Sequence, residues 1–413
     1  MQALVGVSPF FAGLGLDVPL RHPEIPFAHP LDGGRAAVLH ADVAETAAGL
    51  GRDGTAWRRL LGPLAGPALF DDVLGDLRHL PRHPLTLARF GVPGLFGASA
   101  LGRAAFRDEP ARALLAGAAA HSMRALSVPL TAGFGLVLAA SAHATGWPVV
   151  AGGSGTLAAL LVERLAALGI DVECGHLVTD LGALPAARVT LLDVGPAQLL
   201  TLAGPRLPAR TRRRFERFRY GPGVFKIDYA LAGPVPWTHP DCRRAGTLHL
   251  GGTAAETAAS EAAVEAGRHP DRPYVLAVQA CVADPSRAPA GRHTLWAYCH
   301  VPAGSTRDRT AAVEAQIERF APGFRDLVLA RSTRTAAQYA AYDANYVGGD
   351  INAGRAGLAA SVLGPAGGWS RYRTGVPGVY LCSSSTPPGG GVHGMCGHLA
   401  AREALARELR GAA

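Results

Sequence analysis

The segment from Val379 to Ala401 constrains the fold of this 413-residue chain more than any other stretch. It reads as a short apolar strand (Gly378–Cys382), a loop with three consecutive glycines (Gly389–Gly391), and a helix from about Gly397. Such glycines let a backbone approach a flat or charged ligand closely. A helix N-terminus offers N–H groups and the positive end of the helix dipole to an electron-rich group. The pattern predicts a ligand-binding strand–loop–helix unit; the alternative is a glycine-rich turn without a ligand.

Composition places the chain among globular enzymes. It is 48% hydrophobic and 17% charged, which is too apolar for a disordered protein and sufficient for a large core.

The net charge of +8 is carried by arginine, since Lys226 is the only lysine. Seven arginines form a cluster: Arg206, Arg210, Arg212, Arg213, Arg214, Arg217 and Arg219. This Arg206–Arg219 cluster is interpreted as a solvated helix face or as a peripheral contact with an anionic membrane surface. No known nucleic-acid-binding module accompanies it, so we expect no nucleic-acid partner.

Cysteine and histidine spacing predicts no metal site. The six cysteines lie far apart without a CxxC pair, which favours free thiols in a reducing cytoplasm. No charged residue lies between Arg124 and Glu163, a length that could span a membrane. Because Pro129 and Pro148 interrupt this stretch, we expect two buried segments instead of one spanning helix.

Residues 1–147 are expected to be mainly helical, with one extended piece at Arg35–Leu39. The expected helices include Asp42–Leu50, Ala56–Leu61 and Pro110–Ala120. A strand–helix–strand unit is predicted from Val149 to Cys174. Its helix, Leu157–Leu168, places five leucines on one face: Leu157, Leu160, Leu161, Leu165 and Leu168. A further strand is expected at Val189–Val194.

From Pro205 the pattern changes to alternation of apolar and polar residues, which is typical of an antiparallel sheet. The clearest case is Phe225–Leu231, and similar runs occur at Tyr274–Cys281 and His293–Val301. A helix at Arg307–Phe320 is expected to turn three apolar side chains toward a core: Val313, Ile317 and Phe320.

The C-terminal segment VYLCSSSTPPGGGVHGMCGHLAA resembles the FAD signature of phytoene-desaturase-like oxidoreductases, a group near the flavin amine oxidases. Three further stretches resemble the same group over most of the chain: GWPVVAGGSGTLAALLVERLAALG, GPGVFKIDYAL and NYVGGDINAG. The resemblance implies an FAD cofactor. It implies that Ser383 and Ser384 contact the ribityl or pyrophosphate part. Gly391, Val392 and Gly394 would lie against the flavin ring, and the backbone of Val178 would hold the adenine.

The implied fold class is α/β, with a discontinuous Rossmann-like FAD/NAD(P)-binding domain and an inserted α+β substrate domain. Residues 148–204 and 346–413 would form the FAD domain. Residues 1–147 would be the helical part of the substrate domain, and residues 205–345 its antiparallel sheet. Members of the group begin with a strand–GxGxxG–helix unit, whereas Met1 matches a point well inside the pattern. We therefore expect this N-terminal βαβ unit to be missing from the chain.

The implied reaction removes hydride from a C–C bond of an apolar small molecule. Because the flavin accepts the hydride, the catalytic residues stay unassigned, although His393 and Asp350 are candidates.

Two other functions stay open. The motif Gly153-x-Gly155-x-x-Ala158, with Glu173 beyond it, fits an NAD(P) fingerprint, but it also matches a return segment of the FAD domain. The other alternative is a non-catalytic remnant that acts through protein contacts.

Overall fold

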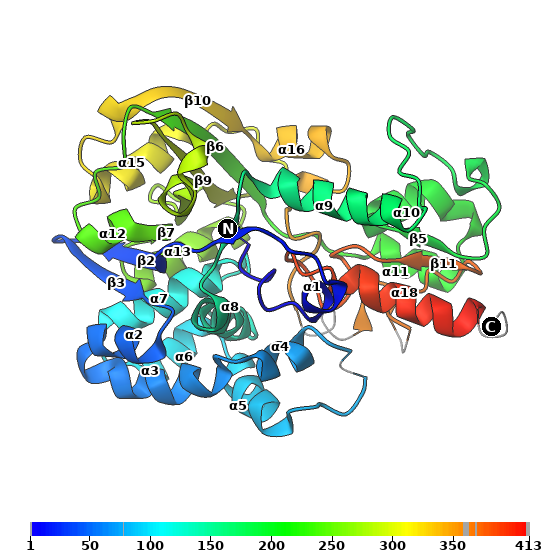
Figure 1. The fold of residues 1–413 in the computed structure, drawn as a ribbon, viewed down its shortest axis with the longest axis horizontal. Coiled ribbons are helices and arrows are strands. Elements are labelled where there is room, and N and C mark those ends of the chain that lie inside the picture. Colours follow the sequence, from blue (N-terminus) through cyan, green and yellow to red (C-terminus); the bar gives the residue numbers. More distant parts are fainter. Residues whose placement is uncertain (1, 77, 358–362, 368–369, 410–413) are drawn as a thin grey trace.

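The computed structural model describes residues 2–76, 78–357, 363–367 and 370–409. The chain folds into a large part, built on a seven-stranded sheet, and a smaller part around the parallel strands β5 and β11 (Figure 1). Helix α9 runs through the middle of the view in Figure 1, below α16, from the first part toward α10 in the second. The mixture of helices and sheets confirms the expected α/β class.

The seven-stranded sheet combines strands from two separate segments of the chain. Its order is β10-β6-β9-β8-β7-β2-β3, and every neighbouring pair is antiparallel except β2 and β7. The strands are β2 (Ile25–Leu31), β3 (Arg35–Leu39), β6 (Gly223–Leu231), β7 (Ala245–Leu250), β8 (Val275–Val278), β9 (His293–Val301) and β10 (Val328–Arg334). Thus residues 1–147, which were expected to be mainly helical, supply β2 and β3 to the sheet that residues 205–345 otherwise form.

Helices cover both faces of this sheet. Helices α7 (Glu109–Ala120) and α13 (Ala254–Glu265) pack on one face, and α15 (Thr310–Phe320) and α12 (Pro240–Arg244) pack on the other. The remaining helices of the large part are α1 (Pro9–Leu14), α2 (Val43–Gly49), α3 (Gly54–Leu61), α4 (Pro67–Val73), α5 (Pro84–Gly94), α6 (Ala98–Ala105), α8 (Thr131–Thr145), α14 (Ala280–Ala283) and α16 (Ala336–Tyr342).

The alternating pattern of β6 is confirmed by its burial. Phe225, Ile227, Tyr229 and Leu231 are buried, whereas Asp228 between them is exposed. The expected side chains of α15 are buried as well, and they pack beneath the sheet in one hydrophobic cluster. Burial of each such side chain stabilises the fold by about 1.5–3 kcal/mol.

The smaller part contains β5 (Thr190–Leu192) and β11 (Val379–Leu381), which pair in parallel. Helices α10 (Pro196–Ala203), α11 (Ala209–Glu216) and α18 (Met395–Glu408) accompany them.

The predicted strand ending at Cys174 is wrong, because the described backbone from 170 to 180 forms no strand. The strand before α9 (Ser154–Ala167) is β4 (Val149–Val150), and it pairs with β1 (Leu20–Arg21) in the antiparallel sense.

The leucine face of α9 is only partly covered. Leu157 is buried, whereas Leu168 at the other end of the predicted face is 60% exposed. Leu160, Leu161 and Leu165 between them are half-buried, so the cover over this face decreases toward the C-terminal end of the helix.

The uncharged stretch after Arg124 divides into α8 and β4, as expected from its prolines. Helix α8 is largely buried against α7. None of the helices in the described part of the chain is long and apolar enough to cross a membrane.

Candidate functional site

The strand–loop–helix unit predicted at the C-terminus is present. Strand β11 leads into a loop that ends at Gly394, and α18 begins at Met395, two residues before the predicted start. Gly391, Val392 and Gly394 are all exposed at this end of the helix. The first turn of α18 carries no acidic residue, and no side chain caps it at Gly394. An electron-rich ligand at this end would therefore meet the positive end of the helix dipole, where, in the described structure, only the first amide, that of Met395, is already bonded to a side chain, His393.

The glycines permit close contacts with the N-terminal segment. A Cβ at Gly391 would lie 2.6 Å from Leu4 Cδ1, and a Cβ at Gly394 would lie 2.3 Å from the ring of Phe10. Both glycines also have positive φ angles, of 131° and 67°. The Ser8 hydroxyl donates a hydrogen bond of 2.6 Å to the carbonyl of His393, which fixes the two segments together. Any other residue at these positions would displace the N-terminal segment.

His393 holds the loop in shape. Its Nδ1 accepts a hydrogen bond of 3.0 Å from the amide of Met395, so the ring proton is on Nε2, which lies 3.0 Å from the carbonyl of Gly389. Burial lowers the pKa of His393. Because both ring nitrogens bond to the backbone of the loop, the geometry favours a positioning role for this histidine.

The serines that follow β11 are at the carboxyl end of the parallel strand pair. Leu381 pairs with Leu192, and two residues later the hydroxyl of Ser383 donates to the carbonyl of Val194 over 2.8 Å. Ser384 is half-buried. Open α/β sheets bind ligands at this end of parallel strands.

A set of short contacts joins Ser383 to the glycine loop. The Thr386 hydroxyl donates to the carbonyl of Ser383 (2.6 Å), and the thiol of Cys396 lies 3.3 Å from the carbonyl of Thr386. The structure thus brings Ser383 and the start of α18 into one compact unit. Val178 packs instead against the apolar cluster beneath β5 and β11, and no contact connects it to the glycine loop in the described structure.

Asp350 is a structural anchor in this geometry. It is 1% exposed, and its carboxylate accepts hydrogen bonds from the amides of Gly221 (2.7 Å), Asn352 (2.8 Å) and Gly354 (3.0 Å). Burial raises the pKa of Asp350, and these three amides oppose the rise. The aspartate therefore ties two of the motifs that carry the family resemblance to each other.

The Gly153 motif does not form a dinucleotide-binding unit in the described structure. Such a unit needs two parallel strands joined by a helix, but β4 pairs only with β1, and the next strand after α9, β5, pairs with β11. Glu173, the expected ribose ligand, is exposed in a segment without regular structure. The amide of Gly152 donates to the carboxylate of Asp284 over 2.9 Å, which ties the loop to the large part.

Sequence reasoning missed a buried histidine cluster on the sheet face that packs against α7. His121 Nε2 lies 3.1 Å from His249 Nε2, and the ring of His249 lies 6.4 Å from that of His29. Burial lowers the pKa of His29 to about 4 and that of His121 to about 3, so these rings are neutral at neutral pH. The three histidines are far apart in sequence. Each is a single histidine in its own element, so no local pattern predicts that they lie together in the folded chain.

The cluster reaches both the interior and the glycine loop. The amide side chain of Asn352 donates to the carbonyl of His121 over 3.3 Å, and Asn352 also borders Gly390. On the interior side, His300 Nδ1 lies 2.8 Å from a carboxylate oxygen of Glu261, and both side chains are 1% exposed. A row of polar side chains therefore extends from the sheet toward the glycine loop.

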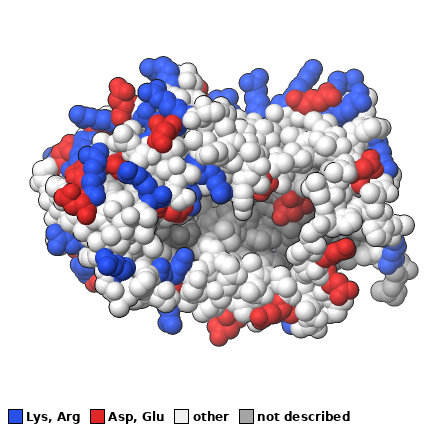
Figure 2. Space-filling model, turned by 90° about the horizontal axis from the view of Figure 1, so that it is seen from above, with Lys and Arg blue, Asp and Glu red and all other residues white. Residues whose placement is uncertain are grey.

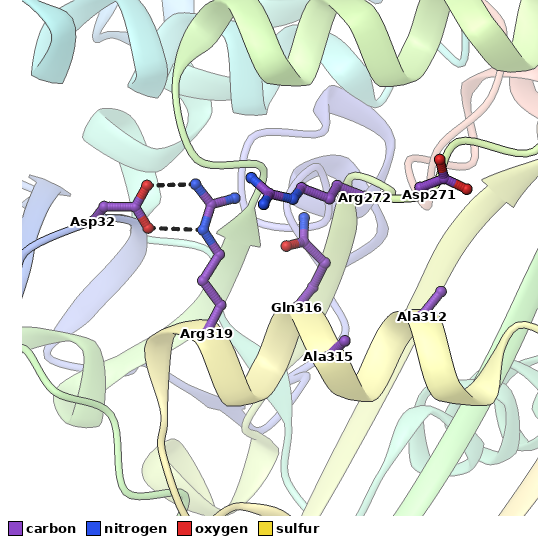
Figure 3. Close-up of a pocket in the computed structure, with 7 residues that line it drawn as sticks. All are labelled: Asp32, Asp271, Arg272, Ala312, Ala315, Gln316 and Arg319. Carbon is purple, nitrogen blue, oxygen red and sulfur yellow. Dashed lines mark hydrogen bonds and ion pairs between the residues drawn. The ribbon is translucent and has the colours of Figure 1, made fainter.

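Two cavities of about 410 Å³ each are open to the surface. One lies between the β2–β3 turn and α15, where Asp32 and Arg319 form an ion pair (Figure 3). None of its lining residues comes from the β11 loop or α18. The other lies between the segment before α5 and the first two turns of α18, with Met395 and Leu399 in its wall. The second cavity is therefore the one adjacent to the candidate site.

The face shown in Figure 2 is hollowed across its middle, between the sheet part on the left and the β5–β11 part on the right. Charged side chains lie mostly around the rim of this hollow. Among the described residues, no group of three or more histidine, cysteine, aspartate or glutamate side chains is arranged to hold a metal ion. All six cysteines are free thiols.

Two solved structures, an oxidase and an oxidoreductase, share the fold of this chain. A mutant of putrescine oxidase is similar over 99% of this chain and 85% of its own, with a TM-score of 0.57 and 15% identity. An oxidoreductase from Methanosarcina mazei is similar over 96% of this chain and 84% of its own, with a TM-score of 0.56 and 15% identity.

In sequence the chain is similar to pyridine nucleotide-disulfide oxidoreductase domain-containing protein 2. The identity is 27% with the Rattus norvegicus protein and 28% with that of Mus musculus, in each case over 344 residues and 72% of this chain. The chain spans 58% of the length of these relatives. No protein-family model matches it. The comparisons confirm the resemblance drawn from the sequence, at the level of FAD-dependent oxidoreductases.

Proposed function

We propose that this chain forms part of an FAD-dependent oxidoreductase of the phytoene-dehydrogenase type, which removes hydride from a C–C bond of an apolar substrate. One observation carries the proposal. The loop before α18 is exposed at Gly391, Val392 and Gly394, it follows the carboxyl end of parallel strands, and the first turn of α18 carries no acidic residue. FAD, when bound there, would supply the hydride acceptor.

The residues of the site fit the flavin end of this cofactor. Backbone amides around Val392 and the N-terminus of α18 would stabilise the negative charge on a reduced flavin ring. His393 would keep the loop in its bent form through its two backbone hydrogen bonds. Asn352 and the neutral histidine cluster would face the substrate side without adding a charge, which suits an apolar molecule.

The phosphate end fits less well. Among the described residues no parallel strand–helix–strand unit is present that could hold a pyrophosphate. We therefore expect these 413 residues by themselves to bind FAD weakly. The free cysteines suit a reducing compartment, and we propose a cytoplasmic location.

Titration of the purified chain with FAD, followed by flavin fluorescence, tests the placement of the cofactor. Val392 is 45% exposed, so its substitution leaves the core unchanged. A carboxylate in Val392→Asp beside the flavin costs about 1–3 kcal/mol, which weakens affinity by roughly 5- to 150-fold. Val392→Asn, of equal size and without charge, is the matched control and should bind as the parent does.

Equal FAD affinity of the two variants would show that the ring lies elsewhere. Stoichiometric, tight FAD in the purified parent chain would contradict the expected weakness at the phosphate end. A parent chain that binds no FAD at saturating concentration would favour the non-catalytic alternative.

A further inference from the structure

Ten of the sixteen large exposed hydrophobic side chains among the described residues lie in two short stretches of the chain. The α5 patch consists of Leu80, Leu85, Val92, Leu95 and Phe96, which are between 53% and 93% exposed. The α9 patch consists of Val162, Leu168, Ile170, Val172 and Leu177, which are between 45% and 86% exposed. Apolar side chains gathered in this way mark contact surfaces, unlike those scattered singly.

The α5 patch is a stripe along one helix. Leu85, Val92 and Phe96 follow one another at spacings of seven and four residues, which places them on the same side of α5 and its C-terminal extension. Arg82 and Arg89 are exposed close to the same stripe. An apolar stripe with arginines beside it is the pattern of a helix that lies in a membrane interface.

The stripe is held firmly on the fold. The carbonyl oxygens of Leu95 and Phe96 accept hydrogen bonds of 3.2 Å from the amides of Leu130 and Ala132, at the start of α8. On its inner side Gly94 is buried, and a Cβ there would lie 3.4 Å from the backbone of Gly133. The exposed side chains are therefore presented by a packed helix.

Charge distinguishes the two patches. Residues 78–107 contain five arginines and no acidic residue, while three aspartates of the preceding segment, Asp71, Asp72 and Asp76, share a cavity with Leu80 and Leu87, and one of them, Asp76, pairs with Arg78. Of these arginines, Arg82, Arg89, Arg103 and Arg107 are exposed. Residues 162–177, around the α9 patch, contain three acidic residues and one arginine. An anionic surface would attract the first patch and repel the second.

We propose that the α5 patch docks on an anionic lipid surface, with its leucine, valine and phenylalanine side chains in the acyl boundary and its arginines at the headgroups. This proposal does not depend on FAD binding. A second copy of the chain fits the patch poorly, because a two-fold contact would bring arginines against arginines. The Arg206–Arg219 cluster is a separate element, since no large exposed hydrophobic side chain lies on α11 in the described structure.

Co-sedimentation of the full chain with vesicles tests the proposal. The probes are vesicles of phosphatidylcholine alone and of phosphatidylcholine with phosphatidylglycerol, each at low and high salt. We expect binding to the anionic vesicles that weakens severalfold at high salt. The double variant Leu85→Asp/Val92→Asp should bind at least about tenfold more weakly. The double variant Val162→Asp/Leu168→Asp, which adds the same charges to the α9 patch, is the matched control and should bind as the parent does.

Circular dichroism of each variant establishes that it is folded, which the exposure of all four side chains favours. An Arg82→Gln/Arg89→Gln variant should lose affinity for anionic vesicles only. Parent-like binding by the α5 variant would overturn the proposal, and so would equal loss in both double variants or no vesicle binding by the parent. A concentration-dependent dimer that Leu85→Asp abolishes would identify a second copy as the occupant instead.

Discussion

Acidification should destabilise this fold through its buried histidines, and His29 gives the sharpest test. His29 lies in β2 and is 0% exposed. Its Nε2 lies 2.7 Å from the carbonyl oxygen of Gly252, which can only accept, so the proton of the neutral ring is on Nε2. Its Nδ1 is buried and has no hydrogen-bond partner in the described structure, with Gly117 packed against it. A second proton on the ring would therefore be buried without an acceptor.

The magnitude follows from the pKa. Burial lowers the pKa of His29 from 6.5 to about 4. Above pH 6.5 both the folded and the unfolded chain carry the neutral ring, and His29 adds no pH dependence. As the pH falls below 6.5, the unfolded chain binds a proton that the folded chain does not, so stability falls by about 1.4 kcal/mol per pH unit. The loss from about pH 7.5 to about pH 5 is about 2 kcal/mol, and it levels off below the folded pKa of about 4.

The assay compares denaturant unfolding of the parent and of His29→Gln at several pH values. Glutamine keeps a donor for the carbonyl of Gly252 but does not titrate. Other buried histidines add to the acid sensitivity of both proteins, so the difference between them isolates His29. We expect His29→Gln to lose about 2 kcal/mol less than the parent between the two pH values. His22→Gln, at an exposed position, is the control.

Parallel loss of stability in the parent and in His29→Gln would refute the reasoning, because it would mean that His29 does not titrate differently in the two states. A larger loss in His29→Gln would reverse the sign of the argument. Either outcome would require an acceptor or a water path at Nδ1.

Three further outcomes are expected. Asp350→Ala leaves three part-buried backbone amides without their acceptor and should cost about 3–5 kcal/mol in the free energy of unfolding. Gly117→Ala places a Cβ within 2.8 Å of nitrogen atoms of His29 and His249, and overpacking of this kind should lower stability by about 1–3 kcal/mol in thermal unfolding. Calorimetric titration with NADH and NADPH should show no binding at the Gly153 motif, and micromolar affinity that is lost in Gly155→Asp would contradict this.

The strands that sequence could predict are those with one buried and one more exposed face. The expected run at His293–Val301 matches β9 in full, and the extended piece at Arg35–Leu39 matches β3. Strand β2 was missed because every residue in it is buried and because it contains Pro26 and Pro30. Strand β10 was missed for the opposite reason, since nearly all of it is polar or exposed at the edge of the sheet.

The candidate site also has a part that sequence could predict and a part that it could not. The glycine loop and α18 are local in sequence, and their pattern was sufficient to predict them. The contacts of Leu4 with Gly391 and of Ser8 with His393 join positions more than 380 residues apart. The histidine cluster likewise depends on the pairing of β2 with β7. No local pattern encodes such contacts, because they arise only when the sheet and the helices have assembled.

The parallel pairing of β2 with β7 also sets the order in which the chain can fold. Ile25 pairs with Ala245, 220 residues further along the chain. Contacts over such a separation form slowly, because a long loop must close first. During synthesis the β2–β3 hairpin would wait roughly 10–40 s for β7 at ribosomal rates of about 5–20 residues per second. Throughout that time one edge of β2 is open to other chains, and its prolines, which lack an N–H group, make that edge a poor template for aggregation.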